Sequence, residues 1–387
     1  MSDQNIFDKL QNIDRRVFYW VLFITLMVPF IRTIGLPVKV VKNTEDLYKG
    51  ITGDNINPGD IIFIMPEKDG TLKIMPSQIA QREEAEEYII DADACDEEGL
   101  LERIIVGSYI LGRDVIRITS SSRIGKEHVD EVRGIVRKLI GLGILEETPK
   151  DILLQCSVDP TKFKLDMLIR RLSLIAATML SEAMQAFLEN NETLANEAVS
   201  REDEADTIYY LAVRLLLSAQ VKPDVAEHVG ATDILFIPAT RLILQYLELI
   251  ADYSEDIAKK IVALSIYRKR LAKDIIEKIY HLGESSQTIF QKALDCVFGG
   301  DLKVANSVLE MQEVLEVKSE ELMRELPEIP YLRAIISCLN KIADLGATIA
   351  DIAINRALEK PSKDVENVIR SVKHVRTLPL AIKKKET

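Results

Sequence analysis

The sequence predicts a mainly α-helical protein, in which a small α/β module and an apolar amino-terminal helix precede a long helical region. Residues 161–358 show a sustained 3.6-residue hydrophobic period, whereas the residues before them alternate short β-branched runs with helical patterns. The composition agrees, because 47% of the residues are hydrophobic and 28% are charged, while only 6% are aromatic. That balance suits long amphipathic helices better than strand-rich sandwiches.

The chain of 387 residues is long enough for two or three domains, since a single core rarely grows past about 250 to 300 residues. Changes of pattern divide it into five segments. They are 1–40, apolar; 41–85, a β-hairpin region; 86–158, a small α/β module; 159–360, a double three-helix bundle; and 361–387, a basic tail.

The apolar segment is a candidate membrane anchor. Val17–Ile31 is uncharged but short for a span, and only extension to Val38 reaches the 20 or so residues that about 30 Å of hydrocarbon requires. Residues 17–38 therefore either cross a membrane, form a buried helix, or are an uncleaved signal-like segment. Basic residues flank both ends, so the orientation stays open, with a slight preference for a cytoplasmic body.

A β-hairpin is predicted from Asn57 to Met75, where two apolar runs flank a polar turn. The next segment alternates helical patterns with β-branched runs, which is typical of a small α/β module. Its predicted elements are a helix at 97–111, a strand at 115–119, a helix at 126–140, and strands at 144–146 and 152–156. The polar run Thr119–Arg123 is either an anion site at the start of a helix or, the favoured interpretation, a loop with a serine cap.

Bulk charge and cysteine content limit the function classes. Sixty-one acidic residues against 49 basic residues give a formal charge of −12, which repels nucleic acid on average and favours cations. The four cysteines lie far apart without a CxxC pair, so we expect reduced thiols in a cytoplasmic protein. The chain has no dinucleotide, P-loop or serine-nucleophile motif, and its four histidines are scattered. We therefore expect no enzyme activity.

A twelve-residue phrase occurs twice in the helical region, at 247–258 and at 339–350. Each copy follows a helix with a glutamate-rich portion, at 197–206 and at 310–321. The repetition predicts two tandem three-helix bundles, made of about six helices, several of them longer than about 25 residues.

Carboxylates in the first copy suggest a metal site. Glu248, Asp252 and Glu255 are spaced i, i+4, i+7 and share one helix stripe, and a second acidic stripe lies on the preceding helix. Like charges at this spacing repel, so two such stripes on antiparallel helices favour a cation. Solvated helix faces are the simpler alternative. The candidate ligands are Glu202, Asp203, Asp206, Glu248, Asp252, Glu255 and, in the second copy, Asp344.

Hard oxygen ligands without histidine or cysteine favour magnesium, manganese, calcium or iron over copper. Two features favour the metal interpretation over solvated faces. The Ala-Asp core of the phrase recurs in both copies, and apolar residues such as Ile250 and Ile257 alternate with the carboxylates. Part of the acidic helix is therefore expected to face inward.

The phrase from Glu248 to Ala258 resembles the motif of the PhoU family of phosphate-uptake regulators, in which Glu-Arg-Ile-Gly-Asp precedes a run ending Asn-Ile-Ala. Leu249 and Ala251 stand in place of the arginine and the glycine, and the resemblance covers about residues 160–360. It implies two PhoU-like three-helix repeats with metal clusters on their acidic faces. In the second copy Asn340 stands where the glutamate is expected, which puts that metal cluster in doubt.

The resemblance also implies a cofactor and partners. The cofactor is expected to be a divalent or ferric ion (Mg, Mn, Fe or Zn), and the partner a component of a phosphate ABC transporter or its sensor kinase. The hairpin from Pro58 to Leu72 resembles the second half of an AbrB-type DNA-binding domain, which precedes PhoU repeats in archaeal regulators. Such a domain works as a dimer, so we expect a homodimer, although the corresponding stretch offers few basic residues.

The leading hypothesis is a metal-binding helical adaptor that regulates phosphate uptake, with DNA binding as an added role. The alternatives are a membrane-tethered helical scaffold and an AbrB/PhoU-type transcriptional regulator.

Overall fold

The computed structural model describes four stretches of the chain, which are residues 62–66, 72–76, 87–233 and 235–359. The chain forms two compact units, Met1–Ala85 and Glu86–Thr387. None of the helices in the described stretches is long and apolar enough to span a bilayer.

Three predicted features lie outside the described residues. They are the apolar segment 17–38, the residues between it and the hairpin, and the basic tail 361–387. The proposed membrane anchor therefore stays a prediction.

The first unit contains a hairpin where the pattern predicts one. Strands β1 (Ile62–Pro66) and β2 (Leu72–Pro76) pair antiparallel, with Ile64 opposite Ile74. The likeness to an AbrB-type domain, which depends on residues outside the strands, stays a prediction.

The second unit begins with an α/β module. Its four strands are ordered β3-β4-β6-β5, with β3 parallel to β4 and the other pairs antiparallel. Ile116 and Leu154 on the sheet are buried together with Leu101 and Ile105 of the first helix. The elements are β3 (Glu87–Asp91), α5 (Leu100–Ile110), β4 (Val115–Thr119), α6 (Lys126–Lys138), β5 (Leu142–Glu147) and β6 (Asp151–Cys156).

Strand β3 was not predicted from the sequence. It follows a glutamate-rich run and lies at an edge of the sheet, so only Ile90 of its five residues is buried and the alternation is weak. The predicted strand 115–119 has the bounds of β4.

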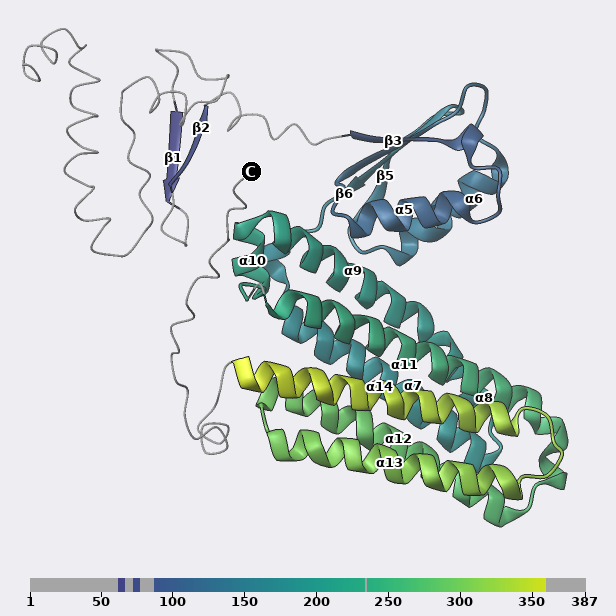
Figure 1. Cartoon of the computed structure of the whole chain (residues 1–387). Coiled ribbons are helices and arrows are strands. Elements are labelled where there is room, and N and C mark those ends of the chain that lie inside the picture. The colour runs from purple at the N-terminus through teal and green to yellow at the C-terminus, as the bar shows by residue number, and fades with distance from the viewer. Residues whose placement is uncertain (1–61, 67–71, 77–86, 234, 360–387) are drawn as a thin grey trace, which may run out of the picture. The chain divides into compact units, whose positions relative to one another are not determined.

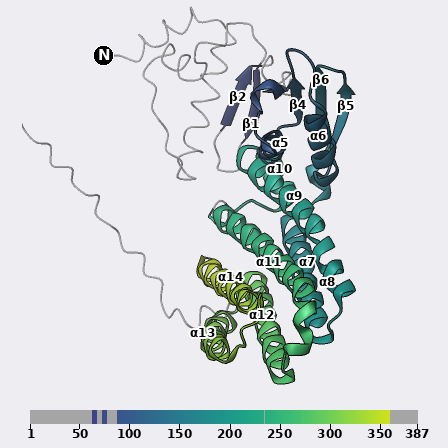
Figure 2. The ribbon, with the colours of Figure 1, turned by 90° about the vertical axis from the view of Figure 1, so that its right-hand side faces the viewer.

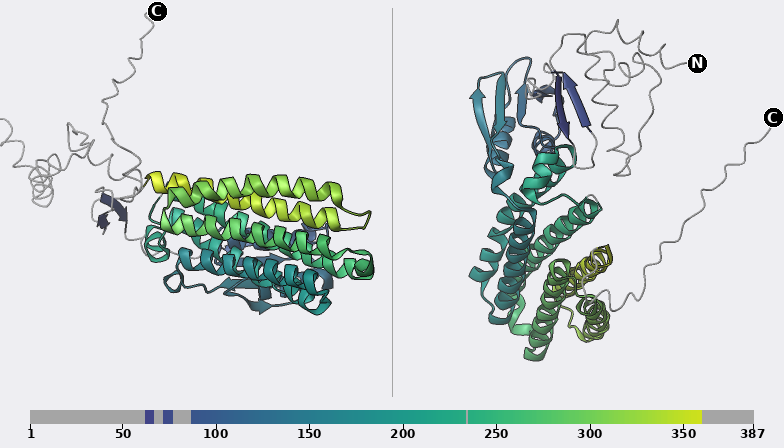
Figure 3. Two further views of the ribbon diagram at one scale, coloured as in Figure 1. Left: turned by 90° about the horizontal axis from the view of Figure 1, so that it is seen from below. Right: turned by 90° about the vertical axis from the view of Figure 1, so that its left-hand side faces the viewer.

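The helical region follows the module and forms two bundles (Figures 1 and 3). Helices α7, α8, α9 and α11 contact one another, as do α12, α13 and α14, and the pairs α7·α12 and α11·α14 join the two bundles. The helices are α7 (Leu165–Glu189), α8 (Glu192–Ser200), α9 (Glu202–Val221), α10 (Pro223–Val229), α11 (Phe236–Leu264), α12 (Lys273–Gly299), α13 (Leu302–Glu325) and α14 (Leu332–Glu359).

The six long helices match the predicted number, but the acidic helix of the first bundle is broken. It consists of α8 and α9, which meet at Arg201. The Arg201 guanidinium donates two hydrogen bonds of 2.7 Å to the carboxylate of Glu182 on α7. This bidentate pair fixes the start of α9 on the bundle.

The α/β module lies against α9 (Figure 2). A buried arginine of α9 attaches the two. Arg214 is 4% exposed and donates hydrogen bonds to the carbonyl oxygens of Tyr109 (2.6 Å) and Arg113 (3.1 Å), and to the carboxylate of Asp114. Its guanidinium also lies over the Tyr109 ring. Buried charges are tolerated when they are paired in this way, so the module and the bundle share one well-defined contact.

Helices α12 and α14 approach most closely at Gly346. A Cβ added there would lie 2.9 Å from the backbone nitrogen and Cα of Phe290 on α12, and 2.8 Å from Ile289 Cγ2. Gly134, in the middle of α6, has no atom within 4 Å of an added Cβ. One glycine is therefore required by packing, while the other is not.

Replacing these two glycines by alanine is expected to have opposite effects on the free energy of unfolding. Gly346→Ala should lower it by about 1–3 kcal/mol, because the methyl group overlaps backbone atoms. Gly134→Ala should raise it by up to about 1 kcal/mol through helix propensity. Urea unfolding of both variants is the measurement, and a Gly346→Ala protein as stable as the parent would contradict the close packing.

Candidate functional site

Helices α9 and α11 pack against each other and place the two acidic stripes side by side. Ala205, Ile208 and Tyr209 on α9 are buried, as are Leu247 and Ala251 on α11. Side chains at i, i+3 and i+4 lie close together on one face of a helix. The side chains that flank the buried positions of α9 and α11 therefore lie along the edge of the contact between the two helices. The carboxylates occupy those neighbouring positions.

The acidic cluster consists of five partly buried carboxylates, of which α9 supplies two and α11 supplies three. Burial and mutual repulsion act on the same groups, which is the signature of like charges that share a site. The members are Glu202, Asp206, Glu248, Asp252 and Glu255.

The pKa values of this cluster are displaced upward. Burial, followed by repulsion from Asp206, raises the pKa of Glu202 to about 7. Burial, followed by repulsion from Asp252 and Asp206, raises the pKa of Glu248 to about 7. The pKa values of Asp206 and Asp252 are raised as well, chiefly by burial. The ionised cluster is therefore destabilised until positive charge enters it.

Asp203 lies at the edge of the cluster and faces the α/β module. Its carboxylate is exposed, and its Oδ1 atom is 2.5 Å from the Lys138 Nζ atom on α6. The pKa of Lys138 is raised, first by this hydrogen bond and also by the charges of Glu202 and Asp206. The module therefore contributes a cation to the rim of the site.

Neighbouring polar groups orient the cluster. The Gln245 side-chain amide donates to Glu248 Oε2 at 2.7 Å and its oxygen accepts from the Tyr209 hydroxyl at 2.7 Å. The Tyr210 hydroxyl donates to Asp206 Oδ2 at 3.4 Å. The Lys259 ammonium lies 2.7 Å from Glu255 Oε1.

These supporting residues were not singled out from the sequence. Gln245 and Lys259 stand three residues before Glu248 and four residues after Glu255, a helical spacing that could have identified them. Lys138 belongs to a different segment, so no local spacing indicates it.

In the second bundle the corresponding positions are mostly uncharged. Asn340 replaces the glutamate and donates to Ser319 Oγ at 2.8 Å, while Asp344 accepts from the Gln312 side chain at 2.8 Å. Both partners are on α13, so Asp344 is not brought to the acidic cluster. The glutamates Glu310, Glu313 and Glu316 of α13 are exposed.

The acidic cluster has the donor type that a hard cation prefers, since every member supplies carboxylate oxygens. Within the described ranges no three histidine, cysteine, aspartate or glutamate side chains already have the spacing of a metal site.

The loop that precedes α6 is hydrogen-bonded to a carboxylate of the same chain. Asp93 accepts hydrogen bonds from Ser120 Oγ (2.7 Å), the Ser121 backbone nitrogen (2.8 Å) and Ser121 Oγ (2.6 Å). These bonds lower the pKa of Asp93 to about 2. The expected serine cap is wrong, because Gly125 is the residue that caps α6.

Neutralising one member of the cluster is expected to stabilise the protein at high pH only. A carboxyl group with a raised pKa binds its proton more tightly in the folded state, so stability is lost as the pH rises from about 4.5 to about 7. With chelator present, Glu248→Gln should raise the unfolding free energy by about 1 kcal/mol at pH 8, after discounting for solvent screening, and by nearly nothing at pH 4.

Urea unfolding at the two pH values measures this difference. Glu313→Gln, which removes the same charge from the exposed face of α13, serves as the control and should show no such pH dependence. An equal effect of Glu248→Gln at pH 4 and pH 8 would show that the ionised carboxylates of the cluster do not destabilise the folded protein.

The comparisons with known proteins concern this same part of the chain. No curated protein matches the sequence. Residues 169–261, which run from α7 into α11 and contain the whole acidic cluster, match the PhoU domain. This match supports the resemblance to the PhoU family for residues 169–261.

Proposed function

We propose that this chain regulates phosphate uptake as a helical adaptor that binds a metal ion in the acidic cluster. The PhoU domain supports the regulatory role. The observation that supports metal binding is the gathering of five partly buried carboxylates along one edge of the α9–α11 contact, of which Glu202, Asp206, Glu248 and Asp252 have raised pKa values.

Electrostatics favours a cation at this place. Ionising the cluster brings several negative charges together in a partly desolvated site, which is unfavourable by amounts that grow as the dielectric constant falls. A divalent or ferric ion bound by Glu202, Asp206, Glu248 and Asp252 would offset that repulsion. Glu255 is neutralised in part by Lys259, so we assign it a supporting role.

A bound ion would supply charge and rigidity. Its effect would be to hold α9 against α11 and to change the charge of the bundle face that a partner contacts. As partner we propose a component of a phosphate ABC transporter or its sensor kinase, in line with the regulatory role of the domain. Oxygen-only ligands favour magnesium, manganese or iron, with zinc as a further candidate.

Metal binding is expected to depend on the cluster. At pH 8, above the raised pKa values of Glu202 and Glu248, the parent protein should bind Mn²⁺ in calorimetric titrations. Glu248→Gln combined with Asp252→Asn should weaken that binding at least about tenfold, because two anionic ligands are lost without a change of shape. Elemental analysis of protein purified without chelator should show the same loss.

The control is Glu313→Gln combined with Glu316→Gln, which removes two charges from the exposed surface of α13. It should bind Mn²⁺ like the parent protein. If the Glu248/Asp252 variant also binds like the parent, the assignment of these ligands is wrong.

The regulatory role predicts a cellular effect. In cells that lack this chain, the uptake of radiolabelled phosphate at high external phosphate should rise, because a repressor of uptake is missing. The parent gene should restore low uptake, whereas the Glu248/Asp252 variant should restore it less well at equal protein level. Unchanged uptake without the chain would count against the regulatory role, independently of the metal.

A further inference from the structure

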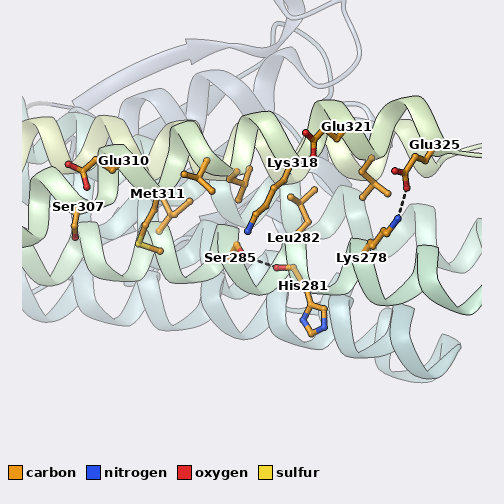
Figure 4. Close-up of a pocket in the computed structure, with 14 residues that line it drawn as sticks. Lys278, His281, Leu282, Ser285, Ser307, Glu310, Met311, Lys318, Glu321 and Glu325 are labelled. Atoms are coloured by element: carbon orange, nitrogen blue, oxygen red, sulfur yellow. Dashed lines mark hydrogen bonds and ion pairs between the residues drawn. The ribbon is translucent and has the colours of Figure 1, made fainter.

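A groove of about 670 Å³ runs between α12 and α13 (Figure 4). Its lining extends from Ser307 near the start of α13 to Glu325 at its end, and on α12 from Lys278 to Ile289. At 1.5 Å per helical residue the α13 side is about 27 Å long. Such a length between two helices suits another helix better than a compact small molecule.

The chemistry of the lining is amphipathic. Leu282, Leu315 and Leu322 form an apolar floor, and Val314 is 54% exposed. Lys318 reaches from α13 toward α12 in the middle of the groove, as Figure 4 shows.

The rim is acidic on the α13 side, since the lining residues of this helix include three glutamates against one lysine, Lys318. Glu310 and Glu321 are among the lining residues, while Glu325 is paired with Lys278. An occupant with an apolar stripe and a basic face would match both parts of the groove.

The last described helix ends near this groove. Helix α14 ends at Glu359, and Ala357 lies next to the turn that joins α12 to α13, because a Cβ added at Gly300 would be 4.0 Å from the Ala357 Cβ. The near end of the groove, at Ser307, is seven residues further along α13 from that turn, or about 10 Å. The 28 residues that follow Glu359 are long enough to reach along the whole groove.

The sequence of these 28 residues has the complementary chemistry. They contain eight lysine and arginine residues and three acidic residues, whereas the whole chain has a formal charge of −12. Apolar residues recur at the three- and four-residue spacing of one helix face, at Val365, Val368, Ile369, Val372 and Val375. Attachment to α14 gives this segment a high effective concentration at the groove.

We propose that residues 363–378 bind in the α12–α13 groove of the same chain as a further helix of the second bundle. The apolar stripe covers the floor and Val314, and Lys373, at the flank of the stripe, lies toward the glutamates of α13.

The test uses the full chain with an environment-sensitive dye on Val314→Cys, and measures quenching of the dye by iodide. The four native cysteines are buried, so labelling is directed to the new one. Val368→Asp combined with Val372→Asp puts two charges on the apolar stripe, and should raise the quenching constant about threefold or more. A dye on Leu174→Cys, an exposed position of α7 outside the groove, should be quenched equally in both chains.

The matched control is Asn367→Asp combined with Ser371→Asp, which adds the same two charges away from the stripe and should leave quenching at the level of the parent. Quenching at Val314 that is identical in all three chains would overturn the proposal. Shielding that increases with protein concentration would also overturn it, because a second copy would then fill the groove.

Discussion

The apolar contact between α9 and α11 is the interaction on which the candidate site depends. Residues such as Ile208 and Leu247 are buried there, and their burial favours the pairing of the two helices. The carboxylates at the edge of the contact oppose it, as the raised pKa values of Glu202 and Glu248 indicate. Helix packing therefore holds together charges that would separate in a freely solvated helix pair, and this arrangement is the physical basis of the proposed cation site.

The two bundles repeat one architecture but differ in chemistry. In the first, the helix that follows the acidic one carries Glu248, and in the second the same position is Asn340, which is bonded to a serine. Without this negative charge, the second bundle lacks the charge repulsion that a bound cation would offset. The second bundle has instead a groove of about 670 Å³ between its first two helices, lined by apolar and charged side chains. The repeat thus provides two different surfaces on one scaffold.

Much of the helical region could be predicted from the sequence, because long amphipathic patterns and a repeated phrase are strong signals. That the acidic stripes lie on two helices packed against each other followed from their spacing and from an antiparallel bundle, whereas the metal site itself stays a prediction. Strand β3 could not be predicted, since an edge strand with one buried residue has little alternation. The break at Arg201 was missed as well, because it depends on a tertiary contact with Glu182.

Contacts between segments far apart in the sequence were also beyond prediction, and they join the α/β module to the site. Lys138 of α6 pairs with Asp203, and its pKa is raised in part by the charges of Glu202 and Asp206. Tyr210 packs against the cores of both the module and the bundle, and donates to Asp206.

A cation that neutralised the acidic cluster would weaken the attraction of the cluster for Lys138, whereas the buried hydrogen bonds of Arg214 to Tyr109 and Arg113 would persist. By linkage, the same coupling acts in reverse, so that the position of α6 affects the affinity of the cluster for positive charge. The module and the acidic helix are therefore joined by two kinds of contact, of which only the Lys138–Asp203 pair depends on the charge of the cluster. If the cluster binds the proposed cation, the module is placed to respond to it without leaving the bundle.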